Sequence, residues 1–275
     1  MQLALQSRTK LVNGTEMPML GLGTYQSPPG NATLEAVTYA LKTGYRLVDT
    51  AKLYDNEKEV GEAIRKSGVP REEVFVTTKL WNSDHGYDAA MRAFNASLKR
   101  LDLDYVDLYL IHWPVPGKRG DSWKALAKLL NDGLCRSIGV SNYNINHLDE
   151  LLAESDIVPA VNQVEFSPFL YQEELLRFCR RNKIQLEAYA PLTKGYKLAD
   201  PRLKAVAAKY SRTPAQVMIR WGLQHEVVEI PKSVKPERIV ENSRVFDFEI
   251  SEEDMKALNA LNEVYRTSWD PSDLR

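Results

Sequence analysis

The chain has 275 residues, is 44% hydrophobic and 27% charged, and carries a formal net charge of −1 at pH 7. This charge argues against a general binder of nucleic acids or anionic membranes, and no stretch approaches the ~18 apolar residues of a membrane span. Residues 1–10 lack the apolar run of a signal peptide, and two cysteines, Cys135 and Cys179, cannot form a disulfide framework, so we expect a cytoplasmic setting.

The chain opens with the pattern of a short β-hairpin. Residues 7–18 are polar and are interrupted by Asn13-Gly14, a dipeptide that favours a tight hairpin turn. Residues 20–24 then predict a short strand with a glycine-rich end. The apolar residues of segment 34–41 recur at helical spacing and predict the first helix.

From there on, strand and helix patterns alternate about eight times. Most strands are near-continuous apolar runs, as expected for parallel strands that are covered on both faces. Capping residues mark the starts of two later helices, at Thr213 and Ser251. The predicted strands span residues 46–48, 74–78, 106–111, 135–140, 160–164, 184–189 and 227–230. The predicted helices span residues 57–66, 87–100, 121–131, 145–153, 171–181, 201–210, 214–223 and 236–242, with a last one from 251.

Eight such units predict a (β/α)₈ barrel, the TIM-barrel architecture, as a single domain over residues 1–275. The hairpin precedes this barrel, and a C-terminal helix and tail follow it. A doubly wound open sheet is the alternative, and it would need a G-x-G-x-x-G turn after its first strand. The candidate for that turn, Gly21-Leu22-Gly23, lacks the third glycine.

Ionisable side chains stand at the ends of three consecutive predicted strands. Asp49, Lys79 and His112 follow these strands, and Tyr54 lies on the loop after the first of them. Each residue taken singly is more often structural, but four of them at neighbouring strand ends favour an active site, which in this fold lies at the C-terminal ends of the strands. Polar groups also follow the other strands, at Gly23-Thr24, Ser141-Asn142, Gln163, Tyr189 and Lys232-Ser233.

The charges of these four residues suggest their roles. A free tyrosine has a pKa near ~10, and we expect the ammonium of Lys79 to lower the pKa of Tyr54. Asp49 would keep Lys79 charged, Tyr54 would act as a general acid, and His112 would polarise and orient a carbonyl. The sequence contains neither a Cys/His metal cluster nor an activated nucleophile. The electrons for reducing a carbonyl would therefore arrive as a hydride from a bound nicotinamide cofactor.

Five motifs resemble those of the aldo-keto reductase family, and they occur in the family's order. The first is Asp49-Thr50-Ala51 with Tyr54 and Asn56-Glu57. The others are residues 106–114, 138–143, 161–165 and 230–242. The resemblance implies a (β/α)₈ barrel that uses NADPH to reduce aldehydes or ketones reversibly to alcohols, with Asp49, Tyr54, Lys79 and His112 as the catalytic residues.

The resemblance also implies where the cofactor lies. Ser141, Asn142 and Gln163 would hold the nicotinamide carboxamide, whose ring would stack on Tyr189, and Lys232, Ser233 and Arg238 would bind the 2′-phosphate, for which cations and a hydroxyl are suitable partners. We expect the nearby Lys235 to be a solvated surface residue instead. The full implied set is Gly23, Thr24, Asp49, Ser141, Asn142, Gln163, Tyr189, Pro191, Leu192, Lys232, Ser233, Val234, Arg238, Glu241 and Asn242.

Tyr25, Trp81 and His112 match positions that line the family's substrate pocket. Short pocket loops resemble the microbial branch, which includes 2,5-diketo-gluconate reductase and prostaglandin F synthase-like members. Lys52 replaces a small residue that is common there, which suggests a preference for acidic substrates. We expect a monomer that acts on a small carbonyl compound, without a metal, a nucleic acid or a membrane as partner.

Two other functions stay open on the sequence. One is a catalytically weak regulatory protein that binds NADPH, although no extra domain that would carry its binding regions is visible. The other is a Schiff-base lyase with Lys79 as the nucleophile. That chemistry needs a neutral amine, whereas an adjacent Asp49 would keep it charged.

Overall fold

The computed structural model describes residues 3–274. Within these residues, eight parallel strands form one sheet in the order β10-β9-β8-β7-β6-β5-β4-β3. The strands are β3 (Leu22–Gly23), β4 (Leu47–Asp49), β5 (Phe75–Leu80), β6 (Val106–Ile111), β7 (Cys135–Ser141), β8 (Val161–Glu165), β9 (Gln185–Tyr189) and β10 (Val228–Glu229).

The two edges of this sheet meet, so the sheet closes into a barrel. The N–H of Gly21 donates to the carbonyl of Glu229 at 2.8 Å, and the N–H of Glu229 donates to the carbonyl of Met19 at 2.9 Å. Gly23 pairs with Lys232 one step further along. A side chain at Gly23 would place its Cβ 2.7 Å from the carbonyl oxygen of Ile230, so this closure needs glycine. The predicted (β/α)₈ barrel is confirmed.

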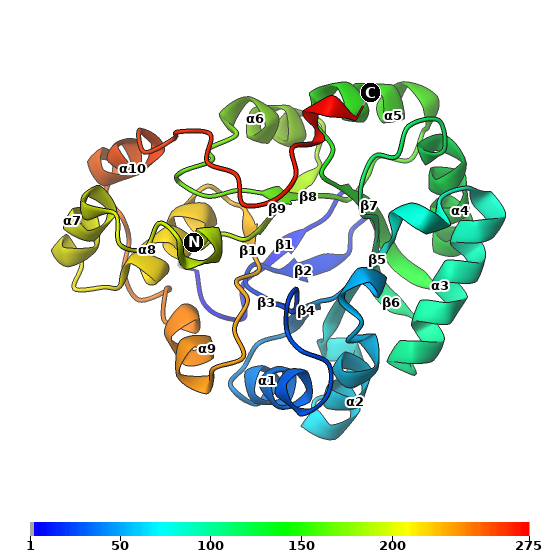
Figure 1. The fold of residues 1–275 in the computed structure, drawn as a ribbon, viewed down its shortest axis with the longest axis horizontal. Coiled ribbons are helices and arrows are strands. Elements are labelled where there is room, and N and C mark those ends of the chain that lie inside the picture. Colours follow the sequence, from blue (N-terminus) through cyan, green and yellow to red (C-terminus); the bar gives the residue numbers. More distant parts are fainter. Residues whose placement is uncertain (1–2, 275) are drawn as a thin grey trace.

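Helices surround the barrel, as Figure 1 shows. The predicted caps of two of them are present: Thr213 forms a capping box with Gln216, and the Ser251 hydroxyl accepts from the N–H of Asp254. The helices are α1 (Asn31–Lys42), α2 (Glu57–Ser67), α3 (Tyr87–Leu101), α4 (Arg119–Asn131), α5 (Ile145–Glu154), α6 (Glu173–Arg181), α7 (Pro201–Lys209), α8 (Pro214–Gln224), α9 (Pro236–Ser243) and α10 (Glu252–Asn259).

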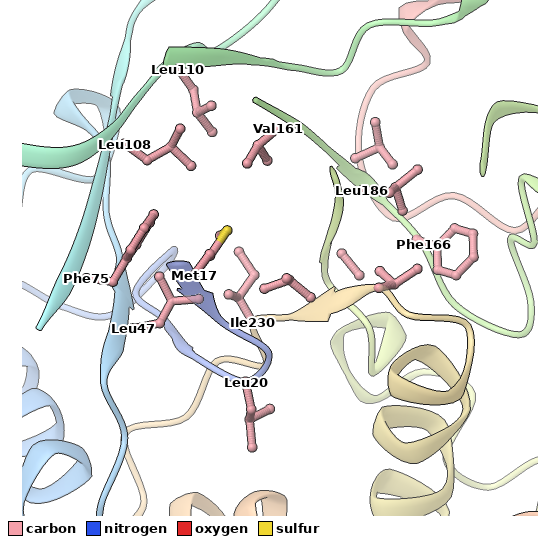
Figure 2. Close-up of a cluster of buried hydrophobic side chains, with 14 of the residues drawn as sticks. Met17, Leu20, Leu47, Phe75, Leu108, Leu110, Val161, Phe166, Leu186 and Ile230 are labelled. Carbon is pink, nitrogen blue, oxygen red and sulfur yellow. The ribbon is translucent and has the colours of Figure 1, made fainter. Parts of the chain in front are cut away.

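The predicted hairpin is formed by β1 (Arg8–Lys10) and β2 (Glu16–Pro18), which pair antiparallel. Figure 2 shows Met17 of this hairpin among the apolar side chains of the barrel strands, including Leu47 and Phe75. Met17 is fully buried. Burying such a side chain contributes about 1.5–3 kcal/mol, so Met17 fixes the hairpin to the hydrophobic core of the barrel.

Strand β5 is longer than predicted. Lys79 and Leu80 continue the ladder with Leu110 and Ile111 of β6, so Lys79 lies within the strand instead of after it. A lysine in this position points its ammonium group into the fold, where it needs a partner. The length of β5 therefore places the charge of Lys79 inside the barrel.

The segment after α10 crosses the C-terminal side of the barrel, and Figure 1 shows it in red running back towards α5. The Glu165 carboxylate at the end of β8 anchors it, accepting from the N–H and hydroxyl of Thr267 at 2.7 and 2.6 Å and from the N–H of Ser268 at 3.1 Å. In the described part of the chain, the helices lack the length and apolar character required to cross a membrane.

Candidate active site

A cavity of about 1130 Å³ opens at the C-terminal ends of the strands. It exceeds the volume of roughly 300–1,000 Å³ that is typical of small-molecule sites, so it has room for a dinucleotide with a substrate. Tyr54, Trp81 and His112 reach it from the segments after β4, β5 and β6. Lys232 and Arg238 reach it from the segment after β10 and from α9.

Three of the four predicted catalytic side chains form one buried group. The Lys79 ammonium donates to both carboxylate oxygens of Asp49 at 2.7 Å and to the carbonyl of Thr50 at 3.0 Å. Its nitrogen also lies 3.1 Å from the hydroxyl oxygen of Tyr54. Lys79 and Asp49 are buried, and Tyr54 is half-buried because it faces the cavity. The three residues thus present one phenol hydroxyl to the cavity, backed by a cation.

The acidity of Tyr54 differs from the sequence-based expectation. Burial is the main cause that raises the pKa of Tyr54 well above its usual value, and the negative charge of Asp49 raises it further. The Lys79 ammonium, which shares its charge with both carboxylate oxygens of Asp49, does not outweigh burial. The phenol therefore remains protonated at neutral pH.

His112 provides a neutral ring beside this phenol. Burial lowers the pKa of His112 well below its usual value, and the charge of Lys79 lowers it further. The ring stands edge-on to Tyr54 at 5.8 Å and to Trp81 at 5.2 Å between centroids. A neutral imidazole carries one N–H, which can donate to an oxygen placed between His112 and Tyr54.

The residues expected to hold the carboxamide form a connected network. The Gln163 amide nitrogen donates to Asp49 Oδ2 at 2.8 Å. Asn142 donates to the carbonyl of His112 at 3.0 Å and accepts from the Tyr189 hydroxyl at 2.8 Å. Asn142, Gln163 and Tyr189 line the cavity, which gives it polar groups and an aromatic face suited to a nicotinamide.

Three of the predicted residues stand behind the cavity wall. The Thr24 hydroxyl donates to the carbonyl of Asp49 at 2.9 Å, and the Ser141 hydroxyl donates to the carbonyl of Gln163 at 2.8 Å. Lys79 is covered by its partners. Sequence position placed these side chains at strand ends. Hydrogen bonds turn the hydroxyls of Thr24 and Ser141 towards backbone carbonyls, and Asp49 holds the Lys79 ammonium.

The predicted phosphate-binding residues lie together on the wall. Of the residues that the structure describes, none forms an ion pair with Lys232 or Arg238. Burial lowers the pKa of Lys232, as expected for a cation without a partner. Lys235 is exposed, as expected for a solvated surface residue, and it also borders this wall. The wall also includes Gly23, Pro191, Leu192, Ser233, Val234, Glu241 and Asn242.

The substrate side contains residues that sequence reasoning missed. Tyr25 and Trp81 line the cavity as predicted, but so do Arg266 and Trp269 of the C-terminal tail. The polar and aromatic composition of the tail was the available signal. Lys52, expected to attract acidic substrates, is instead ion-paired with Asp84 and stands outside the cavity wall.

Comparisons with known proteins agree with this geometry. A model of the aldo/keto reductase family matches residues 19–263. The chain is 51% identical to the glyoxal reductase of Bacillus subtilis (strain 168) over 274 residues, which is 100% of this chain and 99% of that protein.

Solved structures have the same fold. An aldo-keto reductase, MGS-M4, from a Medee basin deep-sea metagenome library superimposes with a TM-score of 0.94 at 46% identity, over 97% of this chain and 99% of that one. An aldo-keto reductase complexed with NADPH gives a TM-score of 0.91 at 34% identity, over 97% and 91% of the two chains. The chain therefore belongs to the aldo/keto reductase family and is an oxidoreductase.

Proposed function

We propose that the protein uses NADPH to reduce small aldehydes or ketones to alcohols, with Tyr54 as the general acid. One observation carries this proposal. The Tyr54 hydroxyl lies at the cavity wall, 3.1 Å from the ammonium of Lys79, which Asp49 holds through both carboxylate oxygens. The cations Lys232 and Arg238 line the same cavity. A proton donor and a site for an anionic cofactor thus share one cavity.

Each residue then has a chemical task. A bound nicotinamide supplies the hydride. The neutral His112 ring donates a hydrogen bond to the substrate's carbonyl oxygen and orients it towards Tyr54. Tyr54 gives its proton to that oxygen as negative charge develops there, and the adjacent Lys79 ammonium stabilises the phenolate that is left.

NADPH is favoured over NADH by the unpaired cations. A 2′-phosphate placed near Lys232, Ser233 and Arg238 would gain charge-assisted hydrogen bonds worth about 1.5–3 kcal/mol each. We expect Arg238→Ala to reduce the NADPH/NADH preference by about 10- to 100-fold. Arg244→Ala, an exposed arginine outside the cavity wall, is the matched control. An unchanged preference in Arg238→Ala would refute this assignment.

The substrate class follows from the cavity wall. Tyr25, Trp81 and Trp269 provide apolar surface, and the Tyr54 and His112 pair provides one polar end. This arrangement suits a small carbonyl compound. The similarity to a glyoxal reductase supports small aldehydes, dicarbonyls included, as first substrates to test.

The test is oxidation of NADPH by a panel of carbonyl compounds, followed by absorbance. We expect Tyr54→Phe to bind NADPH like the wild type and to lose about 10²–10⁴-fold in kcat. Equal loss of binding and turnover would mean that Tyr54 is structural. Tight NADPH binding by the wild type without turnover on any carbonyl would favour the regulatory alternative.

The Schiff-base alternative has less support. Lys79 is fully buried and both oxygens of Asp49 accept hydrogen bonds from it, whereas a nucleophilic amine must be neutral and reachable. Borohydride trapping of a substrate adduct on Lys79 would reverse this judgement. We also propose a single-domain monomer, since the eight-stranded barrel closes on itself within one chain, between β3 and β10.

A further inference from the structure

A buried glutamate of β9 touches the site, and the mechanism above does not use it. Glu187 is fully buried, and its Oε2 accepts a hydrogen bond from the Gln163 amide nitrogen at 2.8 Å. The two residues are paired across β8 and β9. Its other oxygen, Oε1, is buried without a hydrogen-bond partner among residues 3–274.

The same Gln163 nitrogen also donates to Asp49 Oδ2 at 2.8 Å. A primary amide has two N–H donors, and the acceptors Asp49 and Glu187 take both of them. The carbonyl oxygen is therefore the side-chain group of Gln163 that is left for a ligand in the cavity. An acceptor in that position selects a ligand that presents an N–H group.

We propose that Glu187 is a positioning residue: together with Asp49 it holds the Gln163 amide so that the site selects a nicotinamide with an intact carboxamide. The proposal rests on the proposed function, because it concerns the same cofactor. It assigns Glu187 no contact with the cofactor or the substrate, and its effect passes through Gln163.

The charge state of Glu187 fits this role. Burial, followed by the charge of Asp49, raises the pKa of Glu187 to about 8. A neutral carboxyl still accepts from Gln163, and it does not place a second negative charge beside Asp49 that would compete for Lys79. Burial also raises the pKa values of the neighbouring Tyr54 and Glu229 well above their usual values.

The test compares two variants of Glu187 with a control. Glu187→Gln keeps a neutral acceptor for Gln163, whereas Glu187→Leu removes it. Glu229→Gln alters a second buried glutamate, which neighbours Glu187 but has no hydrogen bond to Gln163. Melting temperatures verify that each variant is folded.

The readout is the dissociation constant, from quenching of tryptophan fluorescence, for NADPH and for its analogue with an acetyl group in place of the carboxamide. One hydrogen bond corresponds to about a two- to tenfold preference for NADPH in the wild type. We expect Glu187→Gln and Glu229→Gln to keep this preference and Glu187→Leu to lose it.

A pH series adds a readout that a purely structural role would not change. The oxidised nicotinamide ring is cationic, so ionisation of Glu187 above about pH 8 should shift binding from NADPH towards NADP⁺ several-fold in the wild type. The shift should be absent in Glu187→Gln, which cannot ionise.

The outcomes separate this proposal from the proposed function. A wild type that does not bind NADPH overturns both. A wild type that binds NADPH, with the same analogue preference in Glu187→Leu, overturns the positioning role alone. Weaker binding of both ligands by the same factor in Glu187→Leu would also overturn it, since that result indicates a general structural effect.

Discussion

Replacing Lys79 by methionine should show how the buried ion pair divides its work between stability and catalysis. Lys79 is fully buried, and its nitrogen lies 2.7 Å from each carboxylate oxygen of Asp49. Methionine fills a similar volume without charge. The change therefore leaves Asp49 buried with the Gln163 amide as a remaining donor.

Two arguments bound the cost. At 2.7 Å and an effective dielectric constant of about 20, the lost attraction is about 6 kcal/mol. The unpaired carboxylate can instead take up a proton, which costs an ordinary aspartic acid about 4 kcal/mol at pH 7. The smaller value limits the effect, so we expect Lys79→Met to lose about 3–4 kcal/mol of unfolding free energy, within the range for breaking buried pairs.

Urea denaturation and steady-state kinetics would test this expectation together. The stability deficit should shrink towards pH 4, by about 1.4 kcal/mol per pH unit, because the unfolded chain then also binds the proton. The double variant Asp49→Asn with Lys79→Met should recover at least half of the lost stability, since no unpaired charge remains. Both variants should lose at least about 100-fold in kcat, because Tyr54 lacks its cation.

A stability loss below about 1 kcal/mol in Lys79→Met would refute the reasoning, since that is the behaviour of an exposed pair. A double variant as unstable as the single one would also refute it. In that case the loss would come from packing around the new side chain and not from the charge left on Asp49.

Four further predictions concern the site and its surroundings. Glu165→Gln should loosen the C-terminal tail, because Thr267 of the tail is hydrogen-bonded to Glu165. We expect a higher KM for the substrate and faster tryptic cleavage of the tail, with an unchanged Kd for NADPH. A changed Kd with a constant KM would contradict this role. Because the pKa of His112 is lowered, its ring should be neutral at neutral pH. The plot of kcat/KM against pH should therefore show no change of slope near pH 6.5. A change of slope there that His112→Gln abolishes would contradict the burial argument. The same lowered pKa means that the folded state binds fewer protons than the unfolded chain, so His112 should reduce stability as the pH falls below about 6.5. Gly222→Ala would place a Cβ 1.6 Å from Glu229 Oε1 and should lower the unfolding free energy, measured by urea denaturation, by about 1–3 kcal/mol. Adding Glu229→Ala should recover part of this loss. If the double variant instead lost the sum of the two single losses, the strain would not arise from the contact with Glu229.

Most of the fold could be predicted because its signals are local. Apolar runs marked the strands, helical spacing marked the helices, and Asn13-Gly14 marked the hairpin turn. The ends of elements were less certain, as the extension of β5 through Lys79 and Leu80 shows. That extension depends on pairing with β6, which is information from another part of the chain.

The structure brings most residues of the predicted site together around one cavity, but the electrostatics differ from the sequence-based expectation. Proximity of Lys79 to Tyr54 followed from strand order in a barrel, and the sequence suggested a lowered pKa for Tyr54. The sign was wrong because it depends on burial and on how Asp49 already uses the charge of Lys79. The charge of Lys52 is a similar case, since its pairing with Asp84 could not be read from the sequence.

By itself, the sequence determined a (β/α)₈ oxidoreductase with a tyrosine, a lysine, an aspartate and a histidine at neighbouring strand ends, because hydrophobic periodicity and motif spacing are properties of short segments. Only the tertiary structure decided which donors are already used, since Gln163 reaches both Asp49, 114 residues away, and Glu187 on the next strand. Hydrogen-bond partners and burial depend on contacts between distant segments, and these contacts set which atoms a ligand can meet.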